Sequence, residues 1–134
     1  MIRTKGVLHF TISVSNPDAS EKFYQDVLGL QTIQNVRPTG MVFMKSSDDF
    51  VILTKSETPV RPNLDDNFNV HHAFVVDVDQ YEIAKQHVID CGIKIIFEEE
   101  RREGVFMEGN STSMILTETF SKSLRWSKSL MALS

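Results

Sequence analysis

The sequence contains little cysteine, no long apolar run and no excess of positive charge. Its single cysteine, Cys91, excludes an internal disulfide, and we expect a small buried thiol in a reducing, cytoplasmic environment. No stretch approaches the roughly 18 apolar residues of a membrane-spanning helix, and the N-terminus lacks the apolar segment of a secretion signal. The formal net charge of −4 provides no basic surface for phosphates, which argues against nucleic-acid binding.

The second half of the chain repeats the first at a constant distance of 63 residues, so that His9 and His72 hold equivalent positions. A chain of 134 residues has room for one domain in which two such modules share a core. Three pairs of segments carry the repeat: VLHFTISV (7–14) with VHHAFVVD (70–77), MVFM (41–44) with GVFM (104–107), and VILT (51–54) with MILT (114–117).

The first copy, residues 6–55, has the pattern of a β-α-β-β-β module. Apolar and polar residues alternate before residue 15, which predicts a strand with His9 on its more polar face. Asn16 is suited to cap a helix, Pro17 to begin it and Gly29 to end it. The alternation and the turn residues then predict three short strands, at 30–36, 40–45 and 50–54.

The second copy, residues 69–119, predicts the same order of elements. His72 lies in its first strand, while Asp79 and Glu82 have the spacing of a capping box at the start of a helix that Gly92 ends. The remaining strands are expected at 93–98, 104–108 and 114–119, and residues 56–68 between the copies have linker composition.

The C-terminal tail, residues 120–134, lies outside the repeat. Trp126, Leu130 and Leu133 follow one another at helical spacing, which predicts a short amphipathic helix. The stretch is also basic, but one short basic stretch is weak evidence for binding to a membrane surface. We therefore expect this helix to dock on its own domain or on a second copy of the chain.

The paired modules resemble the vicinal oxygen chelate superfamily, which includes glyoxalase I, extradiol dioxygenases, fosfomycin-modifying enzymes and bleomycin-binding proteins. The resemblance covers residues 6–119 and implies an α+β fold of eight strands, in which two βαβββ modules form a curved, cleft-enclosing mixed sheet. It also implies a homodimer, and the modules could pair within one chain or between two. The residues that carry the likeness are His9, Ala19, Phe23, Tyr24, Leu28, Gly29, His72 and the turn Glu108-Gly109-Asn110.

In metal-using members of that superfamily, two histidines and one or two glutamates hold a divalent ion of iron, manganese, zinc or nickel. The resemblance places His9 and His72 at the histidine positions, but Ile52 and Ile115 stand where the glutamates are expected. Isoleucine offers no donor atom, so the metal centre would be incomplete. Glu118 lies three residues beyond Ile115, and an odd spacing directs it to the other face of a regular strand.

The two isoleucines favour an apolar cleft, and we expect a small, largely apolar or aromatic ligand and no metal cofactor. The alternative is a divalent-metal-dependent lyase or extradiol-type dioxygenase that uses His9 and His72, with Glu118 or Glu108 as a third ligand. A third option is an interaction protein whose cleft is structural. The candidate ligand-binding residues are His9, His72, Thr54, Thr117, Phe43, Phe106, Ile52, Ile115 and, from the resemblance alone, Arg102.

Overall fold

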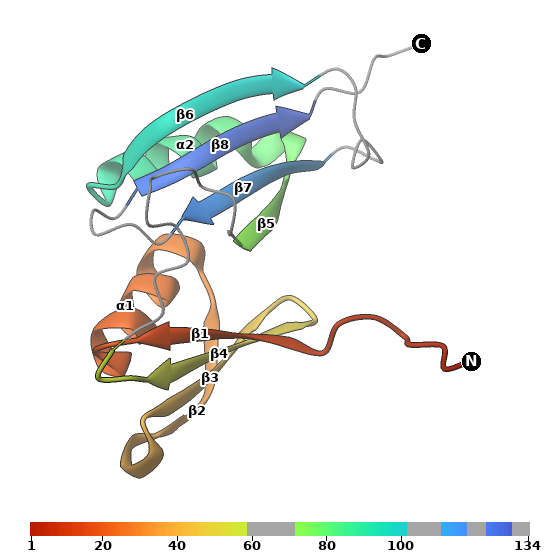
Figure 1. Ribbon diagram of the computed structural model, residues 1–134. Helices are drawn as coiled ribbons and strands as arrows, with labels where there is room; N and C mark the ends of the chain where they lie inside the picture. Colours follow the sequence, from red (N-terminus) through yellow and green to blue (C-terminus); the bar gives the residue numbers. More distant parts are fainter. Residues whose placement is uncertain (59–71, 102–110, 118–122, 130–134) are drawn as a thin grey trace. The chain divides into compact units, whose positions relative to one another are not determined.

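The computed structural model describes residues 1–58, 72–101, 111–117 and 123–129 (Figure 1). The chain divides into two compact units, Met1–Val60 (unit 1) and Arg61–Ser134 (unit 2). The strand expected at 104–108 lies outside the described residues, as does the predicted linker from residue 59 onward. Within the segments that the structure describes, no helix is long and apolar enough to cross a membrane.

Unit 1 is a four-stranded sheet with one long helix, in the β-α-β-β-β order that the sequence predicts (Figure 1). The strand order across the sheet is β1-β4-β3-β2, with β1 and β4 parallel and the other pairs antiparallel. Its elements are β1 (His9–Val14), α1 (Pro17–Leu28), β2 (Gln31–Val36), the 3₁₀ helix η1 (Arg37–Thr39), β3 (Met41–Ser46) and β4 (Asp49–Lys55).

The ends of α1 confirm the boundaries expected from the sequence. The side chain of Asn16 accepts a hydrogen bond from the backbone N–H of Ala19 at 3.1 Å, and Pro17 is the first helical residue. Gly29 ends the helix in the left-handed conformation, at a φ of 68°. On the exposed surface of the helix, the Lys22 ammonium donates to the Asp26 carboxylate at 2.6 Å, which raises the pKa of Lys22.

The core of unit 1 lies between α1 and one face of the sheet. Val42, Met44 and Leu53 in the central strands are fully buried there. Glu21 of α1 reaches the neighbouring strand, where it accepts hydrogen bonds from Thr32 at 2.7 Å and Asn35 at 2.6 Å. The other buried side chains of this core are Ile12, Val14, Tyr24, Val27, Leu30 and Val51.

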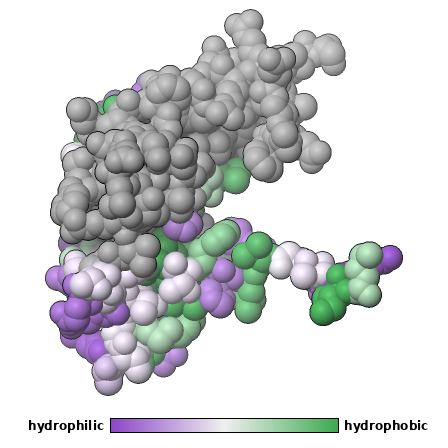
Figure 2. Space-filling model, viewed as in Figure 1, coloured by the Kyte–Doolittle hydropathy of each residue, from purple (hydrophilic) through white to green (hydrophobic). Residues whose placement is uncertain are grey.

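The segment before β1 leaves apolar side chains in contact with solvent. Ile2, Val7 and Leu8 are all exposed, and hydrophobic surface is visible along this segment and where it joins the sheet (Figure 2). The first half of β1 is exposed as well, including Phe10, whereas its second half is buried in the core at Ile12 and Val14.

Unit 2 is also a four-stranded sheet with one helix, and its strand order is β5-β7-β8-β6. Tyr81 and Val88 are the buried residues of its helix, and Ile93 is buried just after it. Its described elements are β5 (His72–Asp77), the 3₁₀ helix η2 (Val78–Gln80), α2 (Tyr81–Asp90), β6 (Lys94–Arg101), β7 (Ser111–Thr117) and β8 (Ser123–Ser129).

Residues 123–129 of the C-terminal tail form strand β8, whereas the helical spacing that begins at Trp126 predicts a helix there. β8 lies between β7 and β6, the place that β3 holds in the sheet of unit 1. An isolated helix of this length is unstable in water, whereas a strand between two others satisfies its backbone groups on both sides. The alternation of Leu124 and Trp126 with Arg125 and Ser127 fits this strand.

Two further expectations for unit 2 are wrong. Asp79 lies in η2, and α2 begins after Gln80 with no side-chain cap, so the predicted capping box with Glu82 does not form. Cys91 is exposed and not buried, because it follows the last helical residue at the solvent side of the chain, before the turn at Gly92.

Candidate functional site

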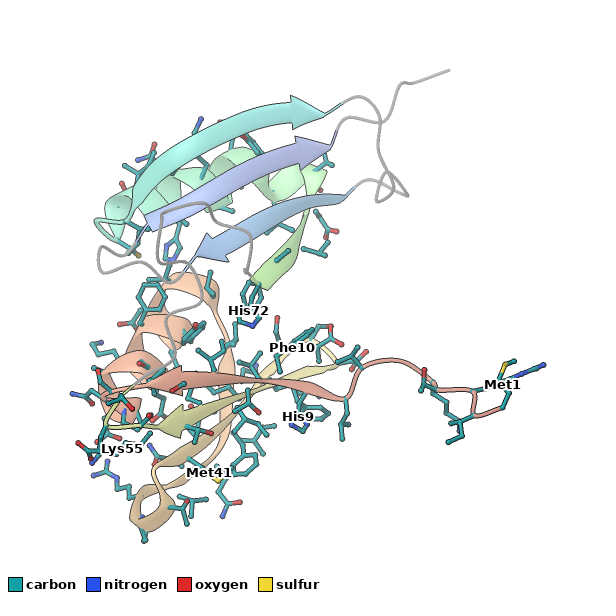
Figure 3. The ribbon with its side chains drawn as sticks, viewed as in Figure 1. Met1, His9, Phe10, Met41, Lys55 and His72 are labelled. Atoms are coloured by element: carbon teal, nitrogen blue, oxygen red, sulfur yellow. The ribbon has the colours of Figure 1, made fainter. Side chains whose placement is uncertain are left out.

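His9 and Phe10 extend from opposite sides of β1 (Figure 3). Phe10 shares its side with Ile12 and Val14, whose side chains enter the core under α1. Because successive side chains of a strand alternate, His9, Thr11 and Ser13 lie on the side away from this core. The polar side of β1 thus belongs to the face of the sheet that the helix does not cover.

Strand pairing extends this side of β1 across β4 and β3. His9 pairs with Phe50, which pairs with Lys45. The pairing continues in two further rows, Thr11 with Ile52 and Phe43, and Ser13 with Thr54 and Met41. These nine residues in three rows are called the His9 face.

The His9 face has an apolar middle and a polar border. Ile52 is 9% exposed at its centre, and Phe50 is 36% exposed beside it. Phe43 and Met41 are half buried, so that aromatic and aliphatic surface extends over two neighbouring strands. The border carries an imidazole, three hydroxyl groups and one ammonium group, which together can donate and accept hydrogen bonds.

Four of the residues predicted from the sequence, His9, Phe43, Ile52 and Thr54, meet on the His9 face. Sequence reasoning missed the other members, above all Lys45 and the exposed ring of Phe50. Lys45 is two residues from Phe43 and Phe50 is two residues from Ile52, so each lies on the same side of its strand as a predicted residue. Only the pairing between β1, β4 and β3 shows that they are neighbours of His9.

Unit 2 arranges the equivalent residues differently. β5 pairs with β7 in an antiparallel sense, whereas β1 pairs with β4 in a parallel sense. His72 is therefore opposite Leu116, and Ala73 is opposite Ile115. Successive positions of a strand alternate between its two sides. Ile115 and Thr117 therefore belong to the other side of β7 from Leu116, the residue that pairs with His72. The candidates outside the described residues are Arg102, Phe106, Glu108 and Glu118.

The donor atoms of the His9 face do not fit a divalent metal ion. His9 supplies one imidazole, and none of the nine residues has a carboxylate or a thiol. Within the part of the chain that the structure describes, no group of three or more His, Cys, Asp or Glu side chains is arranged to hold a metal. Ile52, at the centre of the face, has no donor atom.

Comparison with known proteins supports a shared fold. Residues 6–117 match the model of the Glyoxalase/Bleomycin resistance protein/Dioxygenase superfamily. The fosfomycin resistance protein FosX from Listeria monocytogenes, complexed with Mn(II) and sulfate, superposes with a TM-score of 0.64 and 16% identity over 98% of this chain and 94% of that chain. FosX from Mesorhizobium loti gives a TM-score of 0.60 and 16% identity over 93% and 92% of the two chains.

A protein from the mobile metagenome of V. Pseudocholerae is similar to the same degree. Its TM-score is 0.64 at 16% identity, over 98% of this chain and 99% of that chain. Likeness at this level of identity shows the fold. It confirms the α+β class that the sequence predicts.

Proposed function

The chain belongs to the Glyoxalase/Bleomycin resistance protein/Dioxygenase superfamily, and we propose that it binds a small, largely apolar or aromatic molecule on its His9 face without a complete metal centre. One observation carries this proposal. Ile52, between Thr11 and Phe43 at the centre of the face, is an apolar residue at the strand position where the resemblance implies a metal-binding glutamate.

The composition of the face suits a ligand with an apolar body. Phe43 and Phe50 bring partly exposed aromatic rings next to Ile52, and each Å² of apolar surface that leaves water contributes about 25 cal/mol to binding. The hydroxyl of Thr54 and the imidazole of His9 lie on either side of that surface and supply hydrogen bonds. These polar groups orient the ligand, while apolar contact provides most of the affinity.

A fluorescence titration with N-phenyl-1-naphthylamine, a neutral aromatic probe, tests the proposal. We expect Phe43→Ala to raise the dissociation constant of the probe about tenfold, because it removes half of the aromatic surface. Phe23→Ala is the matched control, since Phe23 is also half buried but belongs to α1. Equal affinity of the Phe43→Ala variant and the wild-type protein would refute binding at this face.

Metal analysis of protein purified without chelators tests the second half of the proposal. We expect no divalent ion in stoichiometric amount. One tightly held ion per chain that disappears in His9→Ala and in His72→Ala would overturn the proposal in favour of a metal centre.

The retention of a histidine at the same position in both copies favours a second candidate, a divalent-metal-dependent lyase or extradiol-type dioxygenase that uses His9 and His72. This activity requires a third protein ligand, for which Glu118 is the first candidate. Glu118→Gln should then lower both metal content and turnover. If neither changes, Glu118 is excluded as the ligand.

We also propose that the protein is a cytoplasmic homodimer. Support for the dimer comes from the family resemblance, and the single cysteine supports a reducing compartment. Light scattering coupled to size-exclusion chromatography measures the mass of the assembly, and a mass of 15.3 kDa would exclude the dimer.

A further inference from the structure

We infer that the ligand of the His9 face is an anion, with an aromatic or aliphatic body and one acidic group that binds at the His9–Lys45 end of the face. This inference rests on the proposed function and adds the charge and the orientation of the ligand. It derives from the distribution of charged side chains over the nine residues of the face.

The row that contains His9 places two basic side chains on either side of an aromatic ring. His9 and Lys45 both pair with Phe50, one on β1 and the other on β3. Neighbouring strands are about 4.8 Å apart, so the backbones of His9 and Lys45 are separated by about 10 Å across β4. A carboxylate, sulfonate or phosphonate attached to an aromatic ring fits between these side chains while the ring lies on Phe50.

No acidic side chain of the face opposes such an anion. None of the nine residues is Asp or Glu. The acidic residues nearest in sequence are Asp48, in the turn between β3 and β4, and Asp49, which pairs with Ser46 at a position of the opposite parity. Within the part of the chain that the structure describes, no carboxylate forms an ion pair with Lys45.

The half-buried position of Lys45 strengthens its attraction for an anion. Lys45 is directly opposite Phe50 in the pairing of β3 with β4, and partial burial reduces the screening by water that weakens an exposed ion pair. At the opposite end of the face, the row of Ser13, Thr54 and Met41 has two hydroxyl groups and no charged side chain. The positive charge is thus confined to one end, which fixes the direction in which an acidic ligand binds. A basic end is notable in a chain with a net charge of −4.

Two probes with the same aromatic body separate the charge of the ligand from its apolar contact. The anionic probe is 1-anilinonaphthalene-8-sulfonate, and the neutral one is N-phenyl-1-naphthylamine. We expect Lys45→Met to weaken binding of the anionic probe fivefold to tenfold and to leave the neutral probe within twofold. Lys45→Arg should restore the affinity for the anion.

Lys55→Met is the matched control variant. Lys55 belongs to β4 and pairs with Val14, so it lies at a position of the parity opposite to that of the His9 face. The substitution Lys55→Met removes one positive charge from the same sheet, as Lys45→Met does, and we expect it to leave the affinity for both probes unchanged. Near-ultraviolet circular dichroism and thermal melting of each variant show whether the fold is retained.

The outcomes distinguish this inference from the proposed function. If the neutral probe binds the wild-type protein and Lys45→Met changes neither probe, the proposed function stands and the anion site is refuted. An equal loss in Lys45→Met and Lys55→Met means general charge attraction and also refutes it. If neither probe binds the wild-type protein, the proposed function itself fails. Should Lys45→Met not fold, Lys45→Gln is measured against the same expectations.

Discussion

Among the glycines of unit 1, Gly40 has the least room for a side chain. It follows η1 with a φ of 69°, in the left-handed region that favours glycine. A Cβ atom added there would lie 2.5 Å from the Cβ of Lys55 in β4. Because a Cβ is fixed to its own backbone, Lys55 can move away only if β4 moves with it.

Hydrogen bonds oppose that movement. The backbone carbonyl of Gly40 accepts from the N–H of Lys55 at 2.9 Å, and the N–H of Gly40 donates to the carbonyls of Val36 and Arg37 at 3.1 Å. The substitution Gly40→Ala therefore combines two costs. The left-handed backbone costs an alanine about 1 kcal/mol, and overpacking against β4 adds about 1–3 kcal/mol.

Gly29 offers a matched control. Its φ is 68°, nearly the same as that of Gly40, but an added Cβ has no atom within 4 Å. We expect Gly29→Ala to lower the free energy of unfolding by about 1 kcal/mol and Gly40→Ala by about 2–4 kcal/mol. Urea unfolding followed by circular dichroism measures both values, with the slope checked for constancy between variants.

Asparagine separates the two costs, since it adopts the left-handed conformation more readily than alanine. Gly29→Asn should recover part of the stability that Gly29→Ala loses, while Gly40→Asn should recover little because the contact with Lys55 persists. Equal losses for alanine at the two positions would refute the argument from close packing.

Three further measurements test other parts of the structure. Asn16→Ala should lower the free energy of unfolding by about 1 kcal/mol, because the cap of α1 is lost, and urea unfolding would show it. Glu21→Ala removes the acceptor of Thr32 and the nearer acceptor of Asn35, which keeps Asp18 at 3.2 Å, and it should cost about 1–3 kcal/mol. Glu82→Ala, on the exposed first turn of α2, should stay within about 0.5 kcal/mol. Cys91 should react with a disulfide reagent in the native state, and a rate that rises only with denaturant would contradict its exposure.

Local signals in unit 1 were sufficient to predict its elements. Asn16, Pro17 and Gly29 define the helix through contacts within a few residues, and the alternation along β1 and β3 agrees with the side that the core covers. The alternation also predicted which side His9 occupies. It could not predict that Lys45 and Phe50 join His9 in one row, because strand pairing depends on residues far apart in the sequence.

Unit 2 shows where local patterns mislead. The spacing of Trp126 and Leu130 favours a helix, whereas the alternation from Leu124 onward fits a strand, and both patterns occupy a short segment. The choice follows from the hydrogen bonds that β7 and β6 offer, which no local pattern contains. Likewise, the repeat predicts the same neighbours for the last strand of each copy, but it does not determine the direction in which β7 runs beside β5.

The place of β8 has a consequence for the order in which the chain acquires structure during synthesis. All strands of unit 1 have been made once Lys55 is added, but β6 has β8 as its neighbour in the sheet, and β8 ends at Ser129. β6 is complete at Arg101, and at about 5–20 residues per second a ribosome needs on the order of 1–6 s to extend the chain from there to Ser129. During that time β6 lacks the strand with which it pairs, so its backbone N–H and C=O groups have no partner in the sheet.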